Sequence, residues 1–448
     1  MQGARTALDG IDAKDMTLAI GFGGDATAAT AAATGSLASG FAAAQTAYDS
    51  GWSSYLASLK APPAPVAGSA QTKRLYEQSL LVLAGLEDKA NRGASIAAPN
   101  MPWIWGTLSL SDDKETSDPY HLVWPRDFYH AATAQKAAGD DAAADPARGL
   151  PVGGPEGGRL VLAEHPRRRD PRLEEPAARR DLAAGRARLV AGPHRRLGLG
   201  QHPRRGRLRD GERPAYEALA DDWQSKVDKW TATNNGPYAP RPHYLRVTKD
   251  AKPNSGTMYT LGDNFPRQVD QREIVDNSFL GLVLFGVKRW DDRTVLNSLK
   301  VGDETSAEPL LVNTKNGQFW RRFTFDGYGE QADGGDWDLF FDNPARQTFG
   351  RAWPLLAGER GEYELIAGKD ATTRLKAIAG AANDGMMLPE QVWDGRPPNE
   401  SSGEGTRSAT PLAWTHAQFV RLAWSIQAGK PIERPSIVAC RYQKELCG

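Results

Sequence analysis

The chain has 448 residues, of which 40% are hydrophobic and 25% are charged, and its formal net charge at pH 7 is zero. This composition is typical of a soluble globular protein, and the balanced charge argues against a chain that binds nucleic acid or membrane surfaces along its whole length. No run approaches the roughly 18 apolar residues of a membrane-spanning helix. Thirteen tryptophans indicate either a large core or a cleft where indole rings stack on sugars.

The N-terminal part predicts a helical arm. Residues 25–59 are rich in Ala, with aromatic residues recurring among them, and predict a helix. A Pro-rich linker follows at residues 61–65. Residues 1–5 lack the pattern of a signal peptide and soon give way to a Gly/Ala-rich tract. We therefore expect upstream sequence to be missing.

The rest of the chain predicts helices joined by long polar loops. Apolar spacing predicts helices at 72–91, 126–138, 215–230, 275–290, 347–367, 372–381 and 412–428. Strands are predicted only at 244–247 and 319–325, and the long loops at 251–273, 316–344 and 383–405. Compact domains rarely need loops of this length. The pattern indicates an all-α toroid whose site is built from loops at one rim.

Residues 146–214 depart from this pattern. Between Asp145 and Pro214 there is no Lys, Phe, Trp, Tyr or Ile, whereas Arg occurs seventeen times. Out-of-frame translation of GC-rich coding DNA tends to give such a composition, and ordinary sequence returns at Tyr216. We expect a frameshifted and shortened segment that is disordered or weakly helical.

The cysteine content is low. Only Cys440 and Cys447 occur, and both two free thiols in a tail and a small terminal disulfide fit their spacing. The disulfide would suit an oxidising compartment. Four ligands at the spacing of a zinc site do not occur in the sequence.

The segment Tyr120–Asp127 is the first candidate site. Pro125 disfavours helix at Trp124, so a helix is expected to start near Arg126 and to present Trp124, Arg126 and Asp127 at its N-terminus. A buried Arg–Asp pair beside aromatic rings is suited to hold sugar hydroxyls by directional hydrogen bonds. The alternative is an Asp favoured by the helix dipole, together with a surface salt bridge.

The segment Asn383–Asp394 is the second candidate site. It places Glu390 after a proline and near Trp393, in an apolar and aromatic setting. A carboxylate positioned in this way could act as a general base. The alternative is a solvated glutamate in a surface loop.

These two segments resemble the sugar-binding and catalytic-base motifs of glycoside hydrolase family 15, which contains glucoamylases and glucodextranases. Residues 98–103, 350–361 and 409–417 resemble the bacterial branch of that family, and the resemblance covers about 72–140 and 216–440. It implies an (α/α)6 barrel, here incomplete and with long rim loops. The implied activity is the release of β-glucose, with inversion, from the non-reducing ends of α-glucans.

The resemblance also implies roles for single residues. Inverting glycosidases use two carboxyl groups about 6.5–9.5 Å apart, one as acid and one as base. Glu390 would be the general base, and Arg126 and Asp127 would hold the terminal glucose. The implied pocket residues are Tyr120, Trp124 and Trp353, with Trp393 shaping the wall beside the base. His121 and His416 are expected to be structural. No cofactor is implied, and a structural calcium site stays open.

The general acid of the family does not appear. It is a Glu within a Trp-Glu-Glu-x-x-Gly-Tyr segment, and no such segment occurs in this chain. Residues 146–214 stand in its place, and Glu174 and Glu175 share no motif with it, so neither is given the role. Loss of general-acid assistance typically costs ~10²–10⁴-fold in rate. We therefore expect an impaired enzyme.

The expected organisation has three parts. Residues 1–60 would be a helical arm after a missing β-sandwich domain, residues 61–440 a catalytic domain interrupted at 146–214, and residues 441–448 a tail. The resemblance further implies an α-glucan or oligosaccharide substrate, a monomer, secretion, and no nucleic-acid or membrane partner. Whether α-1,4 or α-1,6 linkages are preferred depends on loops, some of them in the replaced segment.

Three other functions compete with this interpretation. One is a non-catalytic carbohydrate-binding remnant, and another is a related (α/α)6 enzyme such as a trehalase, against which the loop at 388–393 and the Trp353 segment argue. The third is a nucleic-acid binder that uses the Arg-rich segment on phosphates. Interspersed acidic residues and the lack of aromatic rings for base stacking argue against it.

Overall fold

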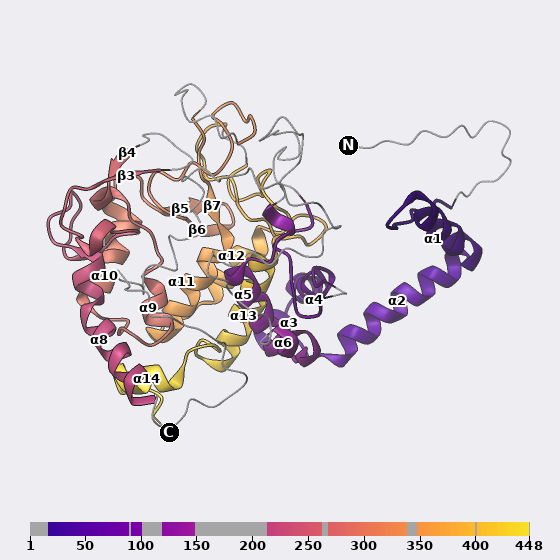
Figure 1. Cartoon of the computed structure of the whole chain (residues 1–448), viewed down its shortest axis with the longest axis horizontal. Helices are drawn as coiled ribbons and strands as arrows, with labels where there is room; N and C mark the ends of the chain where they lie inside the picture. The colour runs from indigo at the N-terminus through magenta and orange to yellow at the C-terminus, as the bar shows by residue number, and fades with distance from the viewer. Residues whose placement is uncertain are drawn as a thin grey trace, which may run out of the picture. The chain divides into compact units, whose positions relative to one another are not determined.

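The structure is a computed structural model that describes residues 17–88, 91–100, 119–147, 213–261, 268–337, 347–398 and 401–447. It forms two compact units, Met1–Lys60 and Ala61–Gly448 (Figure 1). The predicted aberrant segment 146–214 lies outside the described residues except at its two ends, which belong to helices. Glu174 and Glu175 lie outside them too, as does most of the stretch 100–120.

The first unit consists of the two helices α1 (Ala26–Ser39) and α2 (Phe41–Ser58). The single predicted helix is divided because Gly40 adopts a φ of +80°, a value that glycine tolerates best. Asp25 caps α1, with its carboxylate accepting a hydrogen bond from the N–H of Ala28 at 2.8 Å. Neither helix has a buried residue.

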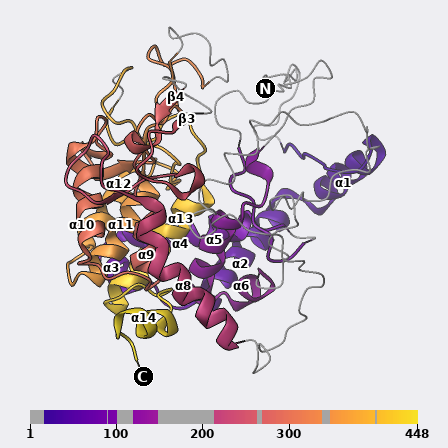
Figure 2. The same ribbon diagram turned by 60° about the vertical axis from the view of Figure 1, so that its left-hand side comes forward.

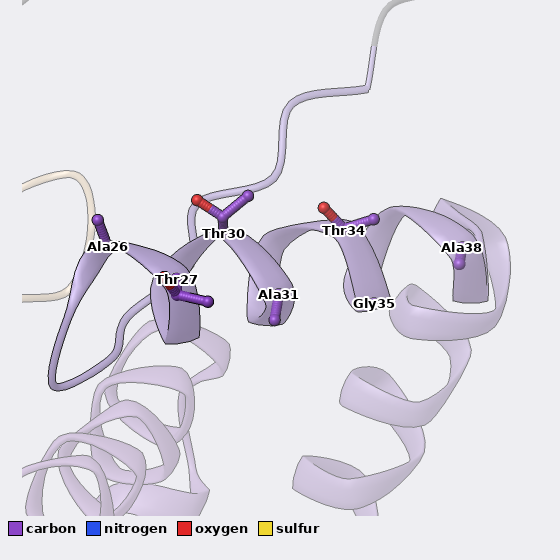
Figure 3. A pocket seen from close by; sticks show the side chains of 7 residues that line it. All are labelled: Ala26, Thr27, Thr30, Ala31, Thr34, Gly35 and Ala38. Carbon is purple, nitrogen blue, oxygen red and sulfur yellow. The ribbon is translucent and has the colours of Figure 1, made fainter.

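A shallow groove runs along α1 (Figure 3). Small side chains line it: Ala26, Thr27, Thr30, Ala31, Thr34, Gly35 and Ala38. It therefore offers a sugar neither an aromatic ring nor a charged partner.

The second unit is mainly helical. Its α-helices are α3 (Ala64–Ala67), α4 (Ala70–Gly85), α5 (Pro125–Ala138), α6 (Asp141–Ala147), α8 (Arg213–Thr231), α9 (Leu280–Leu284), α10 (Arg293–Lys300), α11 (Pro354–Ile366), α12 (Thr372–Gly380), α13 (Ala413–Ala428) and α14 (Ser436–Gln443). Single turns are the 3₁₀ helices η2 (Pro119–His121), η5 (Lys249–Ala251) and η6 (Gln271–Glu273) and the π-helical η7 (Val301–Thr305). None of the described helices is long and apolar enough to cross a membrane.

The strands are short and form three small antiparallel sheets. Their bounds are β1 (Ala232–Thr233), β2 (His243–Tyr244), β3 (Met258–Thr260), β4 (Gln268–Asp270), β5 (Leu311–Thr314), β6 (Gly317–Arg321) and β7 (Ala352–Trp353). The sheet orders are β1-β2, β3-β4 and β5-β6-β7. In the last sheet Trp320 pairs with Trp353, which brings β7 beside the loop that follows β6.

Helix α13 forms the centre of the second unit. Every residue from Ala413 to Ala423 is buried, and the helix packs against α3, α4, α5, α11 and α12 (Figures 1 and 2). A helix that is buried on all sides needs partners for its polar groups. Both nitrogens of His416 and the hydroxyl of Thr415 have such partners in neighbouring segments.

A second core joins α8, α9, α10 and α11. Its buried apolar side chains include Phe279, Leu280, Val283 and Val295. Helix α14 lies beside α8 in both views (Figures 1 and 2), and Arg441 forms an ion pair with Asp221 at 2.6 Å.

Of the residues predicted as a tail, Gln443 contacts the loop after α9, whereas its neighbours up to Cys447 are exposed or half-buried. Gln443 is buried and donates to the carbonyl of Lys288 at 2.6 Å. Cys440 and Cys447 form a disulfide, which corresponds to the second of the two states that their spacing allows.

Most predicted helices lie close to observed ones, and the differences have local causes. The predicted helix 275–290 is reduced to α9, because Asp276 forms a turn with the N–H of Ser278 before it and Gly286 adopts a φ of +78° after it. The predicted helix 347–367 begins only at Pro354, since the two residues before it join a sheet. Among the described helices, α3, α6, α10 and α14 were not predicted.

The packing of α11 on α13 makes a test of this core. A Cβ on Gly358 would lie 2.3 Å from the Cγ of the buried Gln418, so Gly358→Ala should lower the free energy of unfolding by about 1–3 kcal/mol. Gly85→Ala is the matched control, because it also replaces a helical glycine but its new Cβ would have no neighbouring atom within 4 Å. It should be neutral or stabilising by up to ~1 kcal/mol. Urea unfolding of both variants decides; equal stability of the two would contradict the packing.

Candidate active site

The segment that carries Glu390 is fixed by hydrogen bonds along its backbone. The N–H of Leu388 donates to Nε2 of His416 at 2.9 Å, and the carbonyl of Pro389 accepts from the hydroxyl of Thr415 at 2.9 Å. The N–H of Glu390 itself donates to the carbonyl of Ala409 at 2.8 Å. The loop is therefore held on one side by α13 and on the other side by Ala409, which lies shortly before the start of α13.

The Glu390 carboxylate is buried and bound by a tyrosine. The hydroxyl of Tyr120 lies 2.8 Å from Oε1 and 3.0 Å from Oε2, and it is also 2.5 Å from the hydroxyl of Tyr328. The backbone of Tyr120 is fixed as well, since its carbonyl accepts from the N–H of Ala97 at 3.0 Å, and the carbonyl of Ala97 accepts from the N–H of Ala413 at 2.8 Å. Segments far apart in the sequence thus converge on one carboxylate.

Burial dominates the electrostatics of this carboxylate. It raises the pKa of Glu390 to about 8, because the charged form loses water. The hydrogen bond from Tyr120 and the positive charge of Arg322 act in the opposite direction, whereas the Asp127 carboxylate raises the pKa further. Burial, followed by the charges of Glu390 and Tyr328, also raises the pKa of Tyr120 well above its usual value. Tyr120 is therefore a stable donor to the carboxylate.

Arg322 connects the carboxylate with the aromatic side of the site. Its guanidinium makes two 2.6 Å hydrogen bonds to the carboxylate of Asp326, the bidentate arrangement that fixes an arginine best. The same guanidinium lies 4.9 Å from the ring centre of Tyr328 and 5.1 Å from that of Trp353. Asp326 can take its position beside Arg322 because residue 350 is a glycine. A Cβ at that residue would lie 2.4 Å from Cγ of Asp326.

Helix α5 begins close to the predicted position, but Arg126 is exposed rather than buried as the predicted Arg–Asp pair required. Pro125 is its first residue, and Trp124 before it is extended. Asp127 lies in the first turn and is buried, while Trp124 is 37% exposed. The guanidinium of Arg126 lies 4.4 Å above the ring of Trp414 on α13. A buried carboxylate and an exposed indole therefore stand at one helix end, and the charge of Asp127 reaches Glu390.

Trp393 lies in a different environment. Its ring packs on the guanidinium of Arg351, which lies 5.2 Å from the ring centre. Arg351 belongs to a buried cluster in which Asp394 accepts hydrogen bonds from Arg321, Arg351 and Arg396. The structure thus brings Trp393 to this charged cluster, whereas it brings Tyr120, Asp127 and Trp353 to the surroundings of Glu390.

Several residues of the site were not singled out in the sequence. They lie in the stretch 321–337, for which the sequence predicts the end of a strand at residue 325 within a long loop: Arg322, Asp326, Tyr328 and Trp337. The density of aromatic residues among glycines and aspartates in this stretch was an available signal. What the sequence could not show is the pairing of Tyr328 with Tyr120, which are 208 positions apart.

We find neither the family's general-acid segment nor a candidate metal site among the residues that the structure describes. The segment in which the family resemblance would place the acid lies outside the described residues. No group of three or more His, Cys, Asp or Glu side chains that could hold a metal ion occurs among the residues that the structure describes.

Comparisons with known proteins identify the family to which this chain is similar. The family model described as glycosyl hydrolases family 15 matches residues 193–424, and the model of glucodextranase domain N matches residues 3–57. A glucoamylase from Clostridium sp. (strain G0005) is 33% identical over an aligned length of 469 residues. The alignment covers 95% of this chain and 62% of the relative. The crystal structure of a bacterial glucoamylase complexed with acarbose matches with a TM-score of 0.70 and 29% identity, covering 94% of this chain and 64% of that one.

The chain thus spans less than two thirds of the length of these two relatives. The match to the family 15 model covers more than half of the chain and begins inside the segment 146–214. It includes Arg322, Trp353 and Glu390, which the structure brings into one site. The chain belongs to glycosyl hydrolase family 15.

Proposed function

We propose that the protein is an exo-acting, inverting α-glucosidase of glucoamylase or glucodextranase type. It would release β-glucose from the non-reducing ends of α-glucans. The observation that carries the proposal is the buried carboxylate of Glu390. The hydroxyl of Tyr120 lies within hydrogen-bond distance of both oxygens of this carboxylate, and the charges of Arg322 and Asp127 act on it. The similarity to glucoamylases, one of them complexed with acarbose, supports the same substrate class.

Glu390 would act as the general base. In an inverting reaction the base takes a proton from the water that attacks the anomeric carbon. Tyr120 occupies one position on each carboxylate oxygen, and each oxygen has a second lone pair for the water. The positive charge of Arg322 favours the ionised carboxylate that this step needs.

The terminal glucose would be held by residues of α5 and β7. Arg126 and Asp127 would bind its hydroxyls, and Tyr120, Trp124 and Trp353 would line the pocket. Trp353 supports this role because its ring centre lies 5.1 Å from the guanidinium of Arg322, whose charge acts on Glu390. Trp393 would shape the wall beside the base indirectly, through its contact with Arg351.

The enzyme would be impaired. The sequence contains no Trp-Glu-Glu-x-x-Gly-Tyr segment, so the proton donor to the leaving oxygen would be missing. The helices around α13 would form an incomplete (α/α)6 barrel, preceded by a helical arm. We further propose a monomer that acts outside the cell without a cofactor. The Arg-rich segment on which nucleic-acid binding would depend lies outside the described residues.

The role of the base can be tested separately from that of the acid. Fluoride leaves α-glucosyl fluoride with little protonation, so its hydrolysis needs the base but hardly the acid. Glu390→Gln should lower kcat on this substrate by ~10²–10⁴-fold. Glu404→Gln, which changes an exposed glutamate in a neighbouring loop, is the control and should retain kcat. Fluoride release is measured; equal rates in the two variants would exclude Glu390 as the base.

The missing acid predicts a contrast between substrates. The unaltered chain should hydrolyse α-glucosyl fluoride but release glucose from maltose, isomaltose, starch and dextran at a rate ~10²–10⁴-fold below that of a complete family member. Glucose release at the full rate would contradict the impairment. Binding of acarbose in a titration calorimeter without any hydrolysis of the fluoride would instead favour the second candidate, a carbohydrate-binding remnant.

The raised pKa of Glu390 predicts how stability depends on pH. Because its folded pKa is about 8 and its unfolded pKa is about 4.3, the folded state binds the extra proton between these values. Stability from this group is present below the lower value and lost as pH rises towards 8. The Tm of Glu390→Gln should therefore exceed that of the unaltered chain by an amount that grows, by several degrees, from pH 5 to pH 8. A constant difference in thermal scans would contradict the shift.

A further inference from the structure

A chain of hydrogen bonds connects the core of the second unit with the segment that carries Glu390. It starts on α4, where the hydroxyl of Ser79 donates to the carbonyl of Leu75 at 2.7 Å. Nδ1 of His416 lies 2.9 Å from the same hydroxyl, and Nε2 of His416 accepts the N–H of Leu388 at 2.9 Å. All of these side chains are buried.

The direction of these bonds determines the state of the imidazole ring. The N–H of Leu388 can only donate, so Nε2 of His416 must be unprotonated. In a neutral ring the proton is then on Nδ1, from which it is donated to the oxygen of Ser79. Complete burial lowers the pKa of His416 to about 3, which agrees with a ring that stays neutral.

The acceptor at this place is needed for a local reason. The turn 388–390 is buried, and Pro389 within it has no N–H of its own. Without His416 the N–H of Leu388 would be buried without a partner, which typically costs ~1–3 kcal/mol. The carbonyl of Leu388 is also held, by the N–H of Leu412 at 3.0 Å. An apolar side chain at position 416 could fill the core but could not hold this turn.

We propose that His416 is a positioning residue for Glu390, and this inference rests on the proposed role of Glu390 as the base. The neutral ring fixes the peptide of Leu388. Pro389 limits rotation over the next residue, so the fixed peptide determines where the carboxylate of Glu390 points. A displacement of about 1 Å at a reacting group can cost ~10²-fold in rate.

The test uses two substitutions of the same residue. His416→Gln places an amide oxygen near the position of Nε2, where it can accept from Leu388, whereas His416→Phe fills the space and accepts nothing. Ser425→Ala is the matched control: it removes another buried hydroxyl of α13, which accepts from the N–H of Ile432 at 3.3 Å. The measurements are kcat and KM on α-glucosyl fluoride and hydrogen exchange of the peptide that contains Leu388.

We expect His416→Phe to lower kcat by about 10²-fold with little change in KM, and to speed exchange at Leu388. His416→Gln should restore most of kcat, and Ser425→Ala should keep both properties. If His416→Phe does not fold, Ser79→Ala, which removes the partner of Nδ1, should give a smaller loss of kcat in the same direction. Unchanged kcat in a folded His416→Phe variant would overturn the inference.

A double-mutant cycle separates positioning from a general structural effect. In Glu390→Ala, added azide can attack the anomeric carbon of α-glucosyl fluoride directly, forming the carbon–nitrogen bond of β-glucosyl azide while the carbon–fluorine bond breaks and fluoride leaves. If His416 acts only through Glu390, His416→Phe should not change this azide-dependent rate. A loss as large as that in the unaltered background would overturn the inference.

Failure of the proposed function has a different signature. If the unaltered chain does not hydrolyse α-glucosyl fluoride at all, Glu390 is not a working base in this protein. Hydrogen exchange then still decides whether His416 holds the turn, and unchanged exchange at Leu388 in His416→Phe would overturn the inference on its own.

Discussion

The burial of one carboxylate is the constraint on which the candidate site depends. Glu390 is 3% exposed, and a carboxyl group in that position favours its neutral form unless donors and positive charges surround it. Tyr120 supplies the donor and Arg322 the nearby charge. A group that is costly to ionise and yet surrounded by partners for its ionised form is typical of an active site rather than of a core.

The partners of Glu390 are themselves fixed by polar contacts that lead away from the site. Arg322 is held by Asp326, and Tyr328 is held through its carbonyl, which accepts from the side chain of Gln391 at 2.8 Å. The oxygen of the same Gln391 side-chain amide accepts from the N–H of Arg351 at 2.8 Å. The residue after the candidate base thus connects the loop behind β6 with the residue that precedes β7, and hydrogen bonds hold all three segments together.

The same organisation explains why so many charged groups are buried. Asp394 is surrounded by three arginines, and nearby positive charge from Arg396, Arg321 and Arg351 outweighs burial and lowers its pKa. Removing one partner of such a cluster leaves an uncompensated charge, which is far more costly than the net benefit of the pair. The cluster is therefore best understood as fixing the course of long loops, which have few apolar side chains of their own to order them.

What the sequence determined was the set of local features. Pro125 and Asp127 defined the start of α5, the apolar residues from Leu412 to Ala428 defined α13 within one residue, and the motif around Glu390 identified the candidate base. These features depend on propensity, capping and short motifs, which act over a few residues. The family could be recognised for the same reason.

Only the tertiary structure decided which side chains meet. Tyr328 and Arg322 join Glu390 because β6 pairs with β7, and Trp393 turns to Arg351 because its backbone is paired with the loop at Gly403 and Glu404. Likewise, Gly40 divides a predicted helix through its own φ, but His416 acquires its partners only when α4 and α13 pack. Contacts between residues hundreds of positions apart depend on packing of the whole unit, for which a single sequence carries no local signal.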